Sequence, residues 1–283
     1  MASNKGTLYI VATPIGNLDD LSSRAAKTLR QVDVVYAEDT RHSKTLLSHI
    51  DSNRRLVSLH EHNEAERAED VIALLLEGKS AALVSDAGTP AVSDPGSRLV
   101  AAVVAAGIRV CPIPGASALA TALSVSGFAA SSTDVLFVGF LPAKGKDRRA
   151  VLAHIATHTG AAVLYEAPHR VRATLADLGT LNDARAACLC RELTKLHEEI
   201  RHATVAELLD WSKEVELRGE FTLVLGPLPE VESAADAADD AVIDAALTRC
   251  LDAGLTARDA SSAVAAVLEL PRRRVYSRCQ SLR

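Results

Sequence analysis

Three loops rich in glycine and proline have the residue types and the spacing to hold a ligand. They span residues 12–20, 85–96 and 113–118, and each directly follows a short apolar run. Glycine and proline fix tight turns and let the backbone approach a ligand, and the third loop opens a helix whose first N–H groups are free. In open α/β sheets, ligands bind where such loops leave the carboxyl ends of the strands. We therefore predict that the three loops form one cofactor pocket.

Charged residues after other apolar runs supply candidates for proton transfer and for phosphate binding. A carboxylate or an amine can accept a proton, and arginine binds phosphate through charge-assisted hydrogen bonds. Ion pairs or solvated charges at helix starts explain the same residues, so the pattern leaves both roles open. These groups lie at 38–41, 166–170 and 191–195, and a basic cluster lies at 144–149.

Two other patterns resemble functional motifs but lack an essential residue. Gly78-Lys79-Ser80 resembles the end of a phosphate-binding P-loop, but Ala73 stands where that motif needs glycine. His60 and His62 have no third metal ligand at a suggestive spacing, and the histidines at 197 and 202 are one residue too far apart for a zinc-binding H-E-x-x-H motif. We expect no metal site.

Short β-rich runs alternate with helical patterns along most of the chain. This alternation predicts α/β architecture, with a parallel sheet covered by helices on both faces in the first set. The strands expected in the first set are 7–11, 34–36, 56–59, 81–84 and 110–113, with helices at 21–32, 64–77 and 95–106. The second set has expected strands at 135–138, 162–165, 187–190 and 221–225, with helices at 148–156, 171–178 and 205–211.

Changes in composition divide the chain into four parts. A stretch of small residues at 124–133 separates the two sets, so we expect an N-terminal α/β domain at 1–124 and a second α/β domain at 125–228. Residues 229–241 are acidic without a basic residue and predict a linker. A helical extension follows at 242–283, with helices expected at 242–251, after a capping-box-like spacing at 256–259, and at 272–282. The last of these helices is rich in arginine, which favours either a solvated surface or docking on RNA.

Composition limits the class of protein. The chain has 283 residues, is 48% apolar and carries 31 basic against 36 acidic residues, a net charge of −5. This excludes wholesale disorder and argues against a protein held on nucleic acid by charge alone. Five cysteines without a C-x-x-C pair fit a reducing cytosol, and no run reaches the roughly 18 apolar residues that a membrane span needs. We therefore expect a cytoplasmic protein with no membrane partner.

Seven ordered motifs resemble the tetrapyrrole methylase superfamily. Within it they closely resemble the ribosomal small-subunit (cytidine-2′-O)-methyltransferase I family, from about Thr7 to Pro227. The first loop reads Thr-Pro-Ile-Gly-Asn and the second contains Gly-Thr-Pro, whereas cobalamin-pathway members usually carry a glycine-rich loop and Gly-Asp-Pro. The motifs are TLYIVATPIGNLDDLS, AEDTRHS, LVSDAGTPAVSDPG, PIPGASA, FVGFLP, YEAPHR and RELTKLHEE.

The resemblance implies a fold and a cofactor. The fold would be two α/β domains of the tetrapyrrole methylase type with the cofactor cleft between them, plus a small helix-turn-helix-like C-terminal extension. S-adenosylmethionine would bind in that cleft, and S-adenosylhomocysteine would be the product. The enzyme would be a homodimer. Carried over by position, the cofactor contacts fall on Pro14, Ile15, Gly88, Thr89, Val92, Ser117, Ala118, Tyr165, Glu220 and Phe221.

The resemblance also implies a reaction and a partner. The reaction is 2′-O-ribose methylation of a cytidine in the decoding region of 16S rRNA, on the small ribosomal subunit. Glu38 and Lys195 are the leading candidates for the general base, followed by Glu192 and His169. Two alternatives stay open: a small-molecule methyltransferase acting on a tetrapyrrole, and a non-catalytic RNA-binding ribosome-assembly factor. The expected RNA contacts are Arg41, Lys144, Lys146, Arg148, Arg149 and Arg170.

Overall fold

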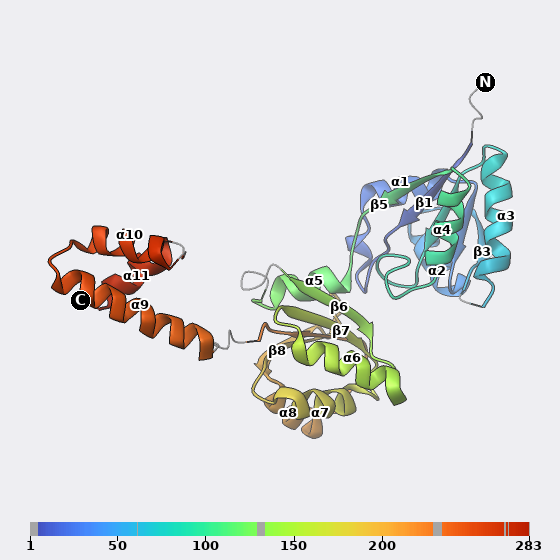
Figure 1. Ribbon diagram of the computed structural model, residues 1–283. Coiled ribbons are helices and arrows are strands. Elements are labelled where there is room, and N and C mark those ends of the chain that lie inside the picture. Colours follow the sequence, from blue (N-terminus) through green and yellow to red (C-terminus); the bar gives the residue numbers. More distant parts are fainter. Residues whose placement is uncertain are drawn as a thin grey trace. The chain divides into compact units, whose positions relative to one another are not determined.

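The computed structural model describes residues 5–60, 62–128, 134–228, 234–268, 270 and 272–282. The chain divides into two compact units, Met1–Leu228 and Pro229–Arg283 (Figure 1). The first unit contains two sheets, and the second contains helices. No helix in the described ranges is both long and apolar enough to cross a membrane.

The first sheet is fully parallel, as the alternation of strands and helices predicts. Its strand order is β3-β2-β4-β1-β5. The three loops predicted to form a pocket follow β1, β4 and β5, which are neighbours in the sheet, so the loops meet at one edge. The strands are β1 (Thr7–Val11), β2 (Val34–Ala37), β3 (Arg55–Ser58), β4 (Ala81–Val84) and β5 (Arg109–Ile113), and the helices are η1 (Leu18–Asp20), α1 (Ser23–Gln31), α2 (Thr40–His49), α3 (Glu64–Leu76), α4 (Ser97–Ala105) and α5 (Ala118–Val125).

Apolar side chains on both faces of this sheet explain its two helical layers. In β2, Val34 and Tyr36 pack into one core cluster, while Val35 and Ala37 pack into another on the opposite face. Successive side chains of a strand point to opposite faces, so a strand that is apolar throughout needs cover on both sides. The sequence analysis did not predict α2, which begins at an N-cap formed by Asp39.

The second sheet is mixed rather than parallel. Its order is β6-β7-β10-β8-β9, and only β6 and β7 run parallel. The sequence analysis did not predict β9, because this edge strand carries few apolar residues and none is fully buried. The strands are β6 (Val135–Phe140), β7 (Ala161–Glu166), β8 (Ala186–Arg191), β9 (Glu199–Thr204) and β10 (Phe221–Leu225), and the helices are α6 (Gly145–Thr157), α7 (Val171–Asn182) and α8 (Val205–Glu214).

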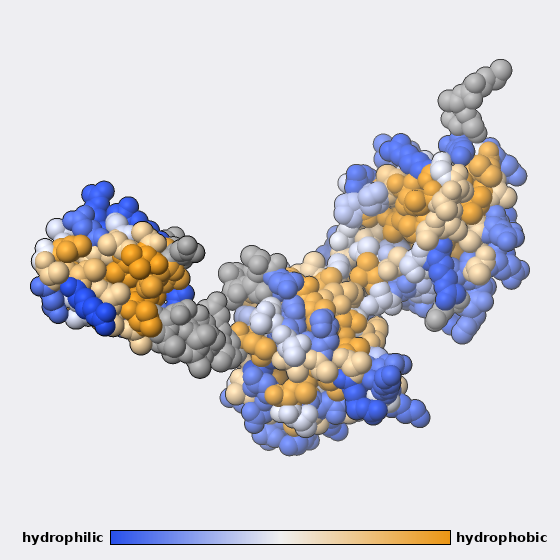
Figure 2. Space-filling view, in the orientation of Figure 1, coloured by the Kyte–Doolittle hydropathy of each residue, from blue (hydrophilic) through white to orange (hydrophobic). Residues whose placement is uncertain are grey.

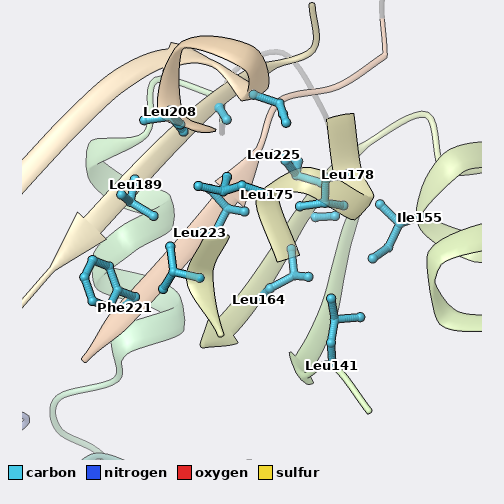
Figure 3. Close-up of a cluster of buried hydrophobic side chains, with 14 residues drawn as sticks. Leu141, Ile155, Leu164, Leu175, Leu178, Leu189, Leu208, Phe221, Leu223 and Leu225 are labelled. Atoms are coloured by element: carbon cyan, nitrogen blue, oxygen red, sulfur yellow. The ribbon is translucent and has the colours of Figure 1, made fainter. Parts of the chain in front are cut away.

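Two apolar clusters cover the faces of the second sheet. One is built mainly of leucines from the strands and from α7 and α8, as Figure 3 shows around Leu164, Leu175 and Leu223. The other joins the opposite face to Ile15, which comes from the loop after β1 of the first sheet. The second cluster therefore brings a predicted cofactor loop against the second sheet.

The C-terminal unit contains α9 (Ala234–Asp252), α10 (Ala257–Val267) and α11 (Arg272–Ser281). Helix α9 begins at Ala234 rather than at Val242, so it includes much of the segment predicted as an acidic linker. Residues 229–233 of that segment lie outside the described residues. Acidic residues of α9 have partners in α11, since Asp240 pairs with Arg274 at 3.0 Å and Asp244 with Arg278 at 2.8 Å. These pairs neutralise two of the acidic side chains of the helix.

Two of the arginines predicted to make the last helix strongly basic are thus engaged inside the unit. Apolar residues hold the three helices together, with Ile243, Leu247 and Val275 fully buried. The visible face of these helices in Figure 2 carries both apolar and hydrophilic residues.

Candidate functional site

A cavity of about 280 Å³ lies where the predicted cofactor loops meet the second sheet. Nine of the ten residues predicted to contact the cofactor line it; the exception, Pro14, is half-buried in the turn next to Ile15. The nine are Ile15, Gly88, Thr89, Val92, Ser117, Ala118, Tyr165, Glu220 and Phe221, and the other lining residues include Ser93, Asp94, Phe140, Glu166, Pro168 and Thr222.

Backbone hydrogen bonds fix the first two loops to each other. Thr13 and Gly88 exchange N–H···O bonds of 2.8 and 3.1 Å, and the Thr13 hydroxyl donates to the Ser85 carbonyl at 3.2 Å. Gly88 has a φ of +82°, which favours glycine, and an added Cβ would lie 3.4 Å from Ile15 Cγ2. The absence of a side chain at Gly88 therefore leaves space in this part of the cavity.

Tyr165 connects the second sheet to the start of α5. Its hydroxyl accepts a hydrogen bond of 3.0 Å from the Leu119 N–H in the first turn of that helix. Phe137 and Phe140 contact its ring edge-to-face, with centroids 5.2 and 5.7 Å away. Burial raises the pKa of the Tyr165 hydroxyl, so it stays neutral and available for hydrogen bonding.

Among the described residues, three carboxyl groups line the cavity, and no lysine, arginine or histidine does. Glu166 is buried, accepts a hydrogen bond of 2.6 Å from Thr174 and lies 3.2 Å from Arg170. Glu220 lies 2.9 Å from the Lys195 ammonium. The third, Asp94, was not predicted as a site residue. Its only signal in the sequence is its place in the loop at 85–96.

Asp94 is the most perturbed acid of the site. Burial raises its pKa to about 6, against a hydrogen bond from the Ser85 side chain, and the charges of Glu38 and Asp86 raise it further. Such a shift in a cavity is typical of functional groups. Its carboxyl group changes charge close to neutral pH.

The surroundings of Lys195 disfavour the prediction that it is the general base. Its ammonium group lies 2.9 Å from Glu192 and 2.9 Å from Glu220. Burial alone would lower the pKa of Lys195, but these two hydrogen-bonded carboxylates outweigh it and raise the pKa. A raised pKa favours the protonated ammonium group at neutral pH, which disfavours Lys195 as the proton acceptor.

Glu192 shares this network. Burial acts to raise its pKa, but the hydrogen bonds from Lys195 and from the Glu220 N–H lower it overall. A carboxylate held in this way is a weak base, which disfavours Glu192 as the proton acceptor.

Glu38 and His169 lie beside the cavity rather than in its wall. Glu38 is half-buried at the end of β2, where burial and then Asp86 raise its pKa and His60 lowers it. A carboxylate with a raised pKa is the better proton acceptor near neutral pH. His169 is exposed, next to the lining residue Pro168.

The predicted RNA-binding residues fall into two groups, and two of them are integral to the fold. Arg148 is only 11% exposed and binds Asp177 at 2.7 Å, and it also donates to the Pro142 carbonyl at 3.0 Å. Arg170 binds Glu166 and the Leu141 carbonyl. Both guanidinium groups already bind a carboxylate and a backbone carbonyl, so the prediction that they grip phosphate is not favoured. The others, Arg41, Lys144, Lys146 and Arg149, are exposed, and Arg41 forms a surface ion pair with Asp39.

Two solved structures that share this fold are named methyltransferases. The chain is similar to cobalt precorrin-4 methyltransferase, with a TM-score of 0.60 and 18% identity over 78% of this chain and 94% of that one. It is also similar to uroporphyrin-III C-methyltransferase of Thermus thermophilus, solved with S-adenyl homocysteine, with a TM-score of 0.57 and 19% identity over 78% of this chain and 97% of that one. At these identities the likeness defines the fold.

Sequence comparison defines the family. The model of the family Tetrapyrrole (Corrin/Porphyrin) Methylases matches residues 7–209, and the chain belongs to this family. It is 47% identical over 222 residues to Ribosomal RNA small subunit methyltransferase I of Halalkalibacterium halodurans, covering 78% of this chain and 76% of the relative. It is 44% identical over 273 residues to the protein of the same name from Synechocystis sp., covering 96% of both chains.

Proposed function

We propose that this protein transfers a methyl group from S-adenosylmethionine to the ribose 2′-hydroxyl of a cytidine in 16S rRNA. The observation that carries this proposal is the identity of 44% along 96% of the chain to a relative named Ribosomal RNA small subunit methyltransferase I. The cavity at the strand ends supports it, because nine residues predicted from the family to contact the cofactor line one space.

The chemistry of the cavity fits S-adenosylmethionine. The apolar side chains of Ile15, Val92 and Phe221 suit the adenosine and the aliphatic chain, while the carboxyl groups suit a cation. The bend at Gly88 leaves room for a ligand against the backbone. When bound, the cofactor supplies a methyl group activated by a positively charged sulfur.

The protein's own residues must then orient the ribose oxygen and take up its proton. In an in-line displacement, the new oxygen–carbon bond forms as the sulfur–carbon bond breaks, which requires close alignment. Among the predicted candidates we favour Glu38 as the proton acceptor, because its pKa is raised. The pKa of Lys195 is raised by its carboxylate partners, which favours the protonated form, and the pKa of Glu192 is lowered, which makes it a weaker base. The place of Glu38 at the carboxyl end of β2 puts it at the sheet edge to which the loops of the cavity belong.

Exposed cations that follow strands β2 and β6 are the proposed contacts to the RNA phosphates. Arg41 is 90% exposed at its side chain, and Lys144, Lys146 and Arg149 are exposed around the start of α6. Long-range attraction of phosphate needs charges that water and ligand can reach.

The same proposal includes a small ribosomal subunit as substrate, a homodimer as the active form and a cytoplasmic location.

Methyl transfer to isolated small subunits tests the proposal. Subunits from a strain that lacks this enzyme, incubated with the protein and methyl-labelled cofactor, should gain label on one cytidine ribose of 16S rRNA. Label on a tetrapyrrole but not on RNA would identify a small-molecule methyltransferase instead. Binding to subunits without any transfer would identify an assembly factor.

A further inference from the structure

Asp94 differs from the other two carboxyl groups of the cavity in having no basic partner. Glu166 lies 3.2 Å from Arg170, and Glu220 lies 2.9 Å from Lys195. No lysine, arginine or histidine of the described chain forms an ion pair with Asp94, and none lines the cavity. The charged groups that act on it are instead Glu38 and Asp86, both acidic.

The loop that carries Asp94 is held in an unusual conformation. Ala91 and Ser93 have φ values of +67° and +64°, which non-glycine residues rarely adopt. Across from them, Gly139 of β6 has a φ of +66°, and a Cβ there would lie 2.6 Å from Ser93 Oγ. Strained residues of this kind persist where the surrounding fold fixes them, commonly at functional sites. This backbone conformation holds Asp94, a carboxyl group without a basic partner, in the cavity wall.

We infer that the Asp94 carboxylate makes this cavity distinguish the positively charged cofactor from its uncharged-sulfur product. The two molecules share adenosine and the amino-acid group, and differ by one methyl group and one positive charge. A partly desolvated carboxylate without a counter-ion gains more from a nearby cation than a carboxylate that is already paired. Loss of the methyl group therefore removes an attraction and favours release of the product. This inference rests on the proposed use of S-adenosylmethionine.

The inference makes the cofactor, but not the product, sensitive to pH. Protonation of Asp94 as the pH falls through about 6 removes the attraction for a cation. The titratable groups facing it are Glu38, Asp86 and Tyr165. His60, which acts on Glu38, lies further along this edge. The contribution of Asp94 is isolated by replacing it with asparagine, which has nearly the same shape and no charge.

Calorimetric titration of both ligands tests the inference. For the full chain at about pH 7.5, Asp94→Asn should weaken binding of S-adenosylmethionine about tenfold and change binding of S-adenosylhomocysteine less than about threefold. Asp183→Asn, at an exposed carboxylate after α7 that is not among the lining residues of the cavity, is the matched control and should leave both affinities unchanged. For the unmodified protein, the ratio of the two affinities should shift toward the product at about pH 5.5.

Other outcomes separate the inference from the proposed function. Equal weakening of both ligands by Asp94→Asn, or an affinity ratio that does not change with pH, would overturn the inference. If Asp94→Asn fails to fold, the pH dependence of the unmodified protein alone decides the question. If the unmodified protein binds neither ligand, the proposed function fails instead.

Discussion

At the scale of single residues, the raised pKa of Asp94 sets a stability cost that can be measured. The folded-state pKa of about 6 lies above the usual value of 3.8, so the folded chain binds more protons than the unfolded chain between these pH values. Stability from this group is then fully present below about pH 4 and is lost as the pH rises through 6. A functional carboxylate is thus kept in its charged form at the expense of stability.

Replacing Asp94 by asparagine should therefore stabilise the protein at pH 7.5 but not at pH 4. We expect a gain in the free energy of unfolding of about 1 to 2 kcal/mol, less than the full value of a two-unit shift because the group is only partly buried. Urea unfolding of the variant and the unmodified protein at both pH values measures it. A gain of the same size at both pH values would contradict the assignment.

Gly88 allows a test of the cavity wall by steric filling. Gly88→Val should weaken cofactor binding more than tenfold, because its methyl groups would extend from a position already 3.4 Å from Ile15. Gly127→Val is the matched control, since Gly127 has a similar φ of +78° but nothing within 4 Å of an added Cβ. Titration calorimetry compares the two variants. Equal loss of binding in both would attribute the effect to backbone strain.

The sequence predicts which backbone positions surround the cavity better than it predicts what each side chain does. Glycine- and proline-rich loops after strands mark ligand sites, so nine of the ten predicted cofactor residues line the cavity. The roles of Lys195, Arg148 and Arg170 depend on partners distant in sequence, such as Glu220 and Asp177. Asp94 was missed because its desolvation depends on the packing of the second domain.

At the scale of secondary-structure elements, regular apolar patterns were the predictable part. The strands buried on both faces, such as β4, appear at the expected positions. The half-exposed β9 and the polar start of α2 carry weak patterns and were missed. The ion pairs that join Asp240 and Asp244 of α9 to α11 connect residues distant in sequence, so no local pattern predicts them.

The arginines of α6 and at the start of α7 divide into those that support the fold and those proposed to contact RNA. Arg170→Ala leaves the buried Glu166 without its cation and should lower the free energy of unfolding by about 2 to 4 kcal/mol. Arg149→Ala, in an exposed position on α6, should change it by less than about 0.5 kcal/mol. Denaturant unfolding distinguishes the two. On the proposed function, Arg149→Ala should still weaken binding to small subunits, and equal stability losses would refute the division.

At the scale of the whole molecule, each of the two compact units has its own buried core, so we expect them to function separately. All residues that line the cavity precede Leu225, and the C-terminal helices have their own buried core. A chain truncated after Leu228 should therefore fold and bind S-adenosylmethionine with a dissociation constant within about twofold of the full chain. Calorimetry measures this, and loss of cofactor binding would show that the helices support the cavity.

The same truncation tests whether the C-terminal helices dock on RNA. On the docking hypothesis, affinity for small subunits falls and its dependence on salt flattens. The flattening should be modest, because Arg274 and Arg278 are already paired with Asp240 and Asp244. Subunit binding with unchanged affinity and salt dependence would leave the helices without a role in docking.

The hydrogen bond from the Leu119 N–H to Tyr165 has a consequence for amide exchange with solvent. The first N–H groups of a helix have no partner within the helix, so the hydrogen bond that protects this amide is the one to the Tyr165 hydroxyl of β7. The hydrogen–deuterium exchange rate of the Leu119 amide therefore reports how often α5 separates from β7. Ligand bound in the cavity should slow that rate more than the rates of amides deep in β4, and Tyr165→Phe should abolish the protection at Leu119.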